Sequence, residues 1–162
     1  MTSDPTSRIT AVARIFSEKG YTLSLAESCT GGMISSMITE MPGASEFFMG
    51  CAVTYSYASK EKLLNVSRKT LVDKGAVSEE TATEMASGAL SLFRTDIAAA
   101  VTGIAGPGGG TSLKPVGTVF IAVTDGIRTE CRKLSLSGSR AEIRGSAAED
   151  LLDMLIGFAG AE

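Results

Sequence analysis

Residues 97–101, Ile-Ala-Ala-Ala-Val, are five consecutive apolar residues in the middle of the chain. A run of this kind with no polar residue is typical of a strand that is buried on both faces of a sheet. A sheet with two buried faces needs a layer of other elements on each side. The run therefore predicts an α/β fold in which this strand lies inside the sheet.

The rest of the chain alternates between segments with helical and with strand-like apolar spacing. Helices are predicted over 5–19, 33–41, a short stretch around Lys60, 78–93 and 140–158, and strands over 21–26, 49–55, 97–101, 116–124 and 127–136. Asp125-Gly126 is a two-residue hairpin signal between the last two strands. This order predicts a three-layer α/β/α sandwich with a mostly parallel mixed sheet and a C-terminal β-hairpin plus helix. No repeat, linker or low-complexity tail interrupts it, so residues 1–162 are expected to form a single domain.

Composition and net charge limit the partners and the cellular compartment that we expect for the protein. A formal net charge of −3 gives no electrostatic reason to expect a nucleic acid or an anionic membrane as partner. No apolar stretch reaches the length of a membrane span, and the N-terminus does not resemble a signal peptide. Three scattered cysteines, Cys29, Cys51 and Cys131, suggest a reducing compartment. The expectation is a cytoplasmic protein.

The chain contains no histidine. This excludes Ser-His-Asp and Cys-His triads and every zinc site that uses imidazole. A Cys-x-x-Cys pair is also missing, so neither a metal nor another cofactor is expected. Acyl or amide chemistry in this chain would need a lysine, a carboxylate, a tyrosine or an activated water as its base.

Three polar or glycine-rich segments follow predicted strands, at residues 28–32, 55–60 and 102–110. In open α/β sheets, ligands bind beyond the carboxyl ends of the strands. The predicted architecture therefore gathers these three segments at one edge of the sheet.

The first segment is Ser28-Cys29-Thr30-Gly31-Gly32. Its glycines let the backbone approach a ligand, and the following helix would point free N–H groups at it. The segment suits an oxyanion or phosphate cradle with the hydroxyl of Ser28 or Thr30 as nucleophile. A glycine-permitted turn with a serine or threonine cap is the ordinary alternative. Cys29 is a competing nucleophile, although without a histidine partner such a cysteine more often packs as a small hydrophobe.

The second segment offers Tyr55, Lys60 and Lys62. A lysine in a dry pocket beside a serine can lose its proton and act as a base if its pKa falls to roughly 7–8. Solvated lysines and a core tyrosine are the ordinary alternatives.

The third segment has five glycines but matches neither a Walker loop nor the dinucleotide fingerprint. It suits either a backbone-lined anion pocket or a flexible loop. Arg140 and Arg144, in the first turns of the last helix, suit either a phosphate or carboxylate contact or a solvated face.

Taken together, the motifs AESCTGG, VTYS with a lysine four residues later, GAVSEETA, TGIAGPGGG followed by KPVGTV, and SGSRAEIR resemble the CinA C-terminal-domain family, in its stand-alone form. The resemblance runs from about residue 8 to 157. It implies an amidohydrolase that converts nicotinamide mononucleotide to nicotinate mononucleotide and ammonia, within pyridine-nucleotide recycling. It also implies that no metal is needed and that the chain forms a homo-oligomer, commonly a dimer.

The resemblance implies Ser28 as nucleophile, Lys60 as base and Tyr55, the tyrosine of the VTYS motif, as a third catalytic residue that could orient or relay a proton. Backbone N–H groups around Thr30, Gly31 and Gly32 are expected to stabilise the oxyanion. The ribose phosphate is expected to bind a further set of residues, Thr102, Gly103, Ala105, Gly106 and Arg140.

This chain departs from the family at two positions. Tyr57 stands where the family often has asparagine, and Ser139 stands where it often has aspartate or asparagine. Two other functions stay open, a non-catalytic nucleotide-binding module and a Ser-Lys amidohydrolase for another carboxamide.

Overall fold

A computed structural model describes residues 5–161. The elements follow in the order α1 (Pro5–Lys19), β1 (Leu23–Glu27), α2 (Met33–Thr39), the 3-10 turn η1 (Ala44–Glu46), β2 (Phe48–Val53), α3 (Tyr57–Leu64), α4 (Arg68–Lys74), α5 (Glu79–Phe93), β3 (Ile97–Gly103), β4 (Thr118–Thr124), β5 (Thr129–Ser135) and α6 (Arg140–Gly160).

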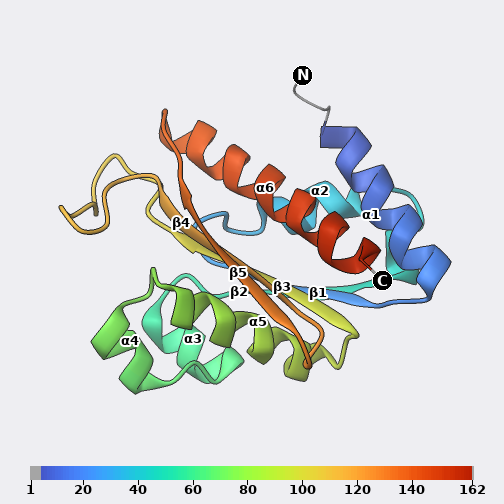
Figure 1. Cartoon of the computed structure of the whole chain (residues 1–162), viewed down its shortest axis with the longest axis horizontal. Coiled ribbons are helices and arrows are strands. Elements are labelled where there is room, and N and C mark those ends of the chain that lie inside the picture. The colour runs from blue at the N-terminus through green and yellow to red at the C-terminus, as the bar shows by residue number, and fades with distance from the viewer. Residues whose placement is uncertain (1–4, 162) are drawn as a thin grey trace.

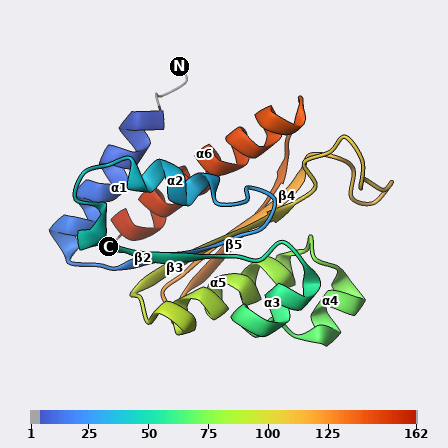
Figure 2. The same ribbon diagram turned by 180° about the vertical axis from the view of Figure 1, so that it is seen from behind.

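The strands form one open mixed sheet in the order β2-β1-β3-β4-β5. β1 is parallel to both β2 and β3, whereas β3–β4 and β4–β5 are antiparallel pairs. Helices α1, α2 and α6 cover one face of the sheet, and α3, α4 and α5 cover the other (Figures 1 and 2). The predicted α/β/α sandwich is confirmed. No helix within residues 5–161 is both long and apolar enough to cross a bilayer.

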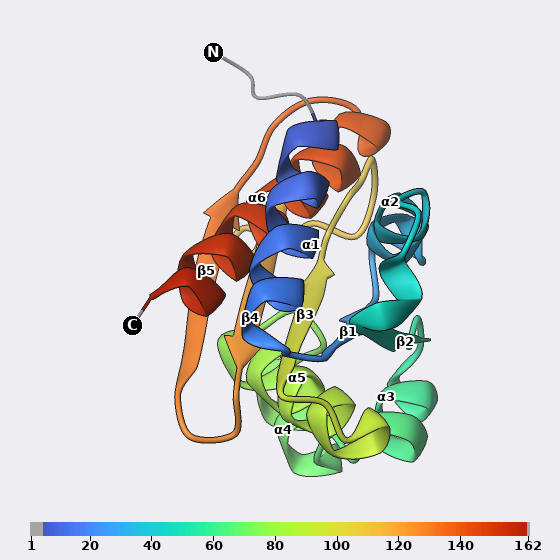
Figure 3. The same cartoon turned by 90° about the vertical axis from the view of Figure 1, so that its right-hand side faces the viewer.

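Strand β3 lies in the middle of the sheet, as its apolar sequence predicted, and its first six residues are buried. Its side chains alternate between two hydrophobic cores. Ala99 and Val101 pack in the core shared with α1, α2 and α6, and Ala98 and Ala100 pack in the core shared with α5. The view from the side shows the helices of the two layers, with α1, α2 and α6 in the upper part and α3, α4 and α5 in the lower part (Figure 3).

Two details differ from the prediction. The sequence pattern missed α4, because its two apolar residues, Leu71 and Val72, are adjacent and give no helical periodicity, and only Leu71 is buried. The hairpin turn is centred on residues 126–127 rather than on Asp125-Gly126. Asp125 closes this turn, since its N–H donates to the carbonyl of Arg128 and its carboxylate accepts the N–H groups of Ile127 and Arg128.

Candidate active site

The carboxyl ends of β1, β2 and β3 meet at the end of the molecule from which the 104–117 loop projects (Figure 1). Glu27 pairs with Val53 on one side and with Val101 on the other. The residues that come next, Ser28 and Thr54, therefore lie side by side, and Thr102 lies beside Ser28. The sheet register thus brings the three predicted segments together.

Ser28 and Lys60 are in direct contact. The Nζ atom of Lys60 lies 2.8 Å from Ser28 Oγ and donates to the carbonyl oxygen of Thr54 at 2.6 Å. Lys60 is 1% exposed and Ser28 is 8% exposed. The structure therefore pairs the predicted nucleophile with the predicted base, and both side chains are buried.

Helix α3 fixes the position of this lysine. Ser56 caps the helix, because its hydroxyl accepts the N–H of Ser59 while the Ser59 hydroxyl accepts the N–H of Ser56. Lys60 follows in the next position, and its own N–H donates to the Ser56 carbonyl. The cap therefore sets where the first turn begins and directs the Lys60 side chain back under the end of β1.

Burial lowers the pKa of Lys60 from 10.5 to about 8, because an ammonium group loses most of its hydration there. No carboxylate within residues 5–161 forms an ion pair that would offset this cost. A substantial fraction of the amine is therefore neutral near pH 8, as a general base requires.

The other candidate nucleophiles fit less well. Burial raises the pKa of the Cys29 thiol to about 11, so this group stays a protonated thiol at neutral pH. The hydroxyl of Thr30 is fully buried and has no hydrogen-bond partner among the described residues. Lys62, the other lysine considered as base, is exposed. The geometry favours Ser28 with Lys60.

Glu27 is a buried carboxylate that sequence reasoning missed. Its Oε2 accepts the N–H groups of Gly32 and Ile34, and its Oε1 accepts both the N–H and the hydroxyl of Ser35. These are the N–H groups at the start of α2 that were expected to face a ligand. The signal was the glutamate of AESCTGG, which follows four buried strand residues where a charge needs partners.

The expected oxyanion donors are therefore corrected. The N–H of Gly32 is bound by Glu27, and the N–H of Gly31 donates to the carbonyl of Ser28. Within residues 5–161, the N–H groups of Cys29 and Thr30 donate to no other residue. Cys29 is 6% exposed whereas Thr30 is fully buried, so the N–H of Cys29, rather than those of the glycines, is the one left for an oxyanion beside Ser28.

Arg144 holds this turn in place from α6. Its Nε donates to the carbonyl of Cys29 at 3.0 Å, and a terminal nitrogen donates to the carbonyl of Thr30 at 2.9 Å. In a trans peptide the C=O and N–H point in opposite directions. Because the Cys29 carbonyl faces Arg144, the Thr30 N–H points away from α6. Arg144 therefore binds the protein's own backbone in this structure.

A cavity of about 160 Å³ opens over Ser28 and Lys60. Its lining brings together most of the predicted site and includes Tyr57, one of the two departures from the family, together with two residues that were not predicted, Ala76 and Val77. The lining residues are Ser28, Cys29, Tyr55, Tyr57, Lys60, Ala76, Val77, Thr102, Gly103, Ala105 and Arg140. Thr30, Gly31, Gly32 and Gly106 lie outside this lining.

The outer part of the cavity is bridged by Arg140. One terminal nitrogen of Arg140 donates to the Gly106 carbonyl at 2.7 Å, and the other donates to the Tyr55 hydroxyl at 2.9 Å. The predicted residues Tyr55, Gly106 and Arg140 are thus joined, although they come from three separate parts of the chain. Thr102 is also engaged, because its hydroxyl donates to the carbonyl of Ala76 at 2.8 Å.

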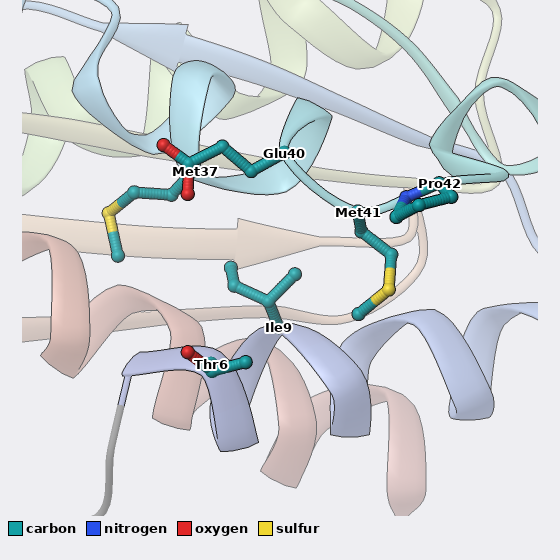
Figure 4. Close-up of a pocket in the computed structure, with 6 residues that line it drawn as sticks. All are labelled: Thr6, Ile9, Met37, Glu40, Met41 and Pro42. Atoms are coloured by element: carbon teal, nitrogen blue, oxygen red, sulfur yellow. The ribbon is translucent and has the colours of Figure 1, made fainter.

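A larger cavity of about 260 Å³ lies between α1 and α2, where Ile9, Met37 and Met41 project toward one another (Figure 4). Its lining contains no serine, cysteine or lysine. It therefore lacks the paired nucleophile and base that distinguish the smaller cavity.

Known proteins resemble this chain in sequence. The model of the CinA C-terminal domain matches residues 6–158. A CinA-like protein of Geotalea uraniireducens is 52% identical over 135 residues, which cover 83% of this chain and 32% of that protein. A CinA-like protein of Geobacter sulfurreducens is 49% identical over 146 residues, which cover 90% of this chain and 35% of that protein. The chain thus spans about a third of the length of these relatives.

The solved structures that resemble the chain match it over its full length. The crystal structure of the competence/damage inducible protein CihA from Agrobacterium tumefaciens has a TM-score of 0.95 and 38% sequence identity, and the match covers 99% of this chain and 98% of that one. With the family model covering almost all of the sequence, these likenesses show that the chain belongs to the CinA C-terminal domain family.

Proposed function

We propose that this protein hydrolyses the carboxamide of nicotinamide mononucleotide to nicotinate mononucleotide and ammonia. The observation that carries the proposal is the Lys60 amine, buried without a carboxylate partner and 2.8 Å from the Ser28 hydroxyl. A serine activated by an adjacent neutral base is the arrangement required for covalent acyl transfer. This pair supplies the base that a chain without histidine must find elsewhere.

The reaction would proceed through an acyl-enzyme. Neutral Lys60 takes the proton of Ser28 as the serine oxygen attacks the carboxamide carbon. The N–H of Cys29, which lines the cavity, stabilises the oxyanion, where one donor typically contributes about 10²–10³ in rate. The ammonium of Lys60 then gives its proton to the leaving nitrogen, and the C–N bond breaks. Water, deprotonated by Lys60, attacks the ester, and the carboxylate and the serine hydroxyl are released.

The lining of the cavity suits an anionic ligand with one small reacting end. It contains the cationic side chain of Arg140 and no carboxylate. Its volume of about 160 Å³ is below the roughly 300–1,000 Å³ of sites for drug-sized ligands. The ring and its carboxamide would therefore lie inside, and the ribose phosphate would extend toward Tyr55 and Arg140 at the mouth.

The test is release of ammonia from nicotinamide mononucleotide by the wild type and by Ser28→Ala and Lys60→Ala. Both variants should lose essentially all turnover, whereas Cys29→Ala, which alters the neighbouring thiol, should stay active. Full activity in either Ser28→Ala or Lys60→Ala would contradict the mechanism. Tight binding of the nucleotide in calorimetry without ammonia release from the wild type would favour a binding module instead.

A further inference from the structure

Tyr57 lies at the mouth of the cavity, directly above the catalytic lysine. It is the first residue of α3, and Lys60 is three positions later. Because residues i and i+3 share one face of a helix, the phenol ring and the amine project from the same side, and both line the cavity. Tyr57 is 49% exposed whereas Lys60 is 1% exposed. The ring is therefore at the entrance and the amine at the bottom.

The hydroxyl of Tyr57 contacts a second part of the lining, which we call the wall segment, residues 75–77. The N–H of Ala76 donates to the Tyr57 hydroxyl at 3.3 Å. Ala76 and its neighbour Val77 both line the cavity. Tyr57 thus supplies one surface of the cavity with its ring and holds another through its hydroxyl.

The inner side of the wall segment is held by buried side chains. Thr102 donates to the Ala76 carbonyl at 2.8 Å, and Thr81 donates to the Gly75 carbonyl at 2.7 Å. Both threonines are buried. Since Tyr57 is exposed and its bond to Ala76 is longer, the attachment at the mouth is the one that a substitution can release without disturbing the core.

The side of the cavity formed by β3 and the residues after it cannot be widened by a substitution in this way. Gly103 and Ala105 line the cavity there and present little or no side chain. A Cβ atom at Gly103 would lie 2.5 Å from a methyl group of Val119, so this backbone already packs against the core. Tyr57 and the wall segment therefore form a side of the cavity that can widen, separate from the outer bridge between Tyr55 and Arg140.

On the basis of the proposed carboxamide hydrolysis, we propose that Tyr57 determines which carboxamides enter the cavity. Its ring, and the wall segment that it holds, limit the reacting end of the substrate to a single six-membered ring. A carboxamide on a fused two-ring system is excluded, because the second ring would need the volume that Tyr57 and Ala76 occupy. Tyr57 acts on specificity and takes no part in proton transfer.

The test uses calorimetry on Ser28→Ala protein, which cannot form an acyl-enzyme. The two probes are nicotinamide mononucleotide and the corresponding mononucleotide of quinoline-3-carboxamide. Steric discrimination in a pocket commonly spans about 10–200-fold, so the preference for the single ring should fall by about tenfold or more in Tyr57→Ala. Tyr57→Phe keeps the ring and loses only the link to Ala76. Its preference should therefore lie between that of the parent protein and that of Tyr57→Ala.

Leu63→Ala is the matched control, because Leu63 is an exposed side chain of the same helix that does not line the cavity. Its preference should equal that of the parent protein. An unchanged preference in Tyr57→Ala would overturn the role of Tyr57 and leave the proposed function standing. If Tyr57→Ala loses the preference but the wild type releases no ammonia, only the proposed function is overturned. If neither probe binds, the proposed function and the role of Tyr57 are both overturned.

Discussion

At the scale of single residues, the site depends on two buried ionisable side chains, Glu27 and Lys60, that have opposite surroundings. Glu27 is surrounded by donors, since four hydrogen bonds from Gly32, Ile34 and Ser35 reach its two oxygens. Lys60 has no ion-pair partner within residues 5–161, and burial lowers its pKa to about 8. A paired carboxylate stabilises the turn, whereas an unpaired ammonium is driven toward the neutral base that the reaction needs.

Replacing Glu27 by glutamine should therefore disturb the turn that carries Ser28. The new amide presents N–H groups to backbone N–H donors and leaves at least one of them unsatisfied. A loss of about 1–3 kcal/mol in the free energy of unfolding is expected, together with a fall in kcat. Urea unfolding and the ammonia assay measure the two effects.

Glu40→Gln is the matched control for this substitution, since Glu40 is an exposed glutamate just after the same helix. It should change neither quantity. Wild-type stability and turnover in Glu27→Gln would show that the carboxylate does not hold the turn.

At the scale of elements, the position of Lys60 depends on how closely α3 packs against α5. Gly88 lies in α5 beneath the end of α3, and a Cβ atom there would overlap the carbonyl oxygen of Leu64. A glycine in the interior of a helix normally costs stability. Here it permits the close approach that holds the helix carrying the base.

Gly88→Ala should consequently destabilise the protein by about 1–3 kcal/mol and lower kcat/KM, because α3 must shift. Gly145→Ala in α6 is the control, since a Cβ atom at Gly145 meets nothing within 4 Å. The control should gain up to about 1 kcal/mol from helix propensity. Thermal melts compare the two variants, and equal stability of both would contradict the close packing of α3 on α5.

The helices and strands also show how much of the fold and of the site could be predicted from the sequence. The apolar run of β3 and the serine caps of α5 and α6 were predictable, because local spacing and capping determine them. The pairing of Ser28 with Lys60 was expected from motifs, and its geometry required the sheet register. A glutamate after a buried strand was a signal for Glu27, but its partners depend on how the turn after β1 folds. The wall segment could not be predicted, since it arises from contacts between separate segments that local pattern does not encode.

At the scale of the whole molecule, a net charge of −3 gives no general attraction for an anionic ligand. The attraction must be local to the cavity, where Arg140 is present and no carboxylate lines the surface. Such a short-range attraction at an exposed arginine is screened by salt.

Raising the ionic strength to about 0.5 M should therefore raise KM for nicotinamide mononucleotide and leave kcat nearly unchanged. The KM of nicotinamide riboside, which lacks the phosphate, should respond much less. Equal salt dependence for the two compounds would show that the phosphate is not held by a charged group of the cavity mouth.

The central claim is that Lys60 acts as a neutral base, and the pH dependence of kcat/KM for ammonia release tests it most directly. Below its pKa the amine carries the proton that it must accept from Ser28, so activity should be low at acidic pH. It should rise through an apparent pKa near 8 and level off above it. The substrate phosphate titrates near pH 6 and would give a separate, lower step. A profile that is flat from about pH 7 to 9 would contradict the claim.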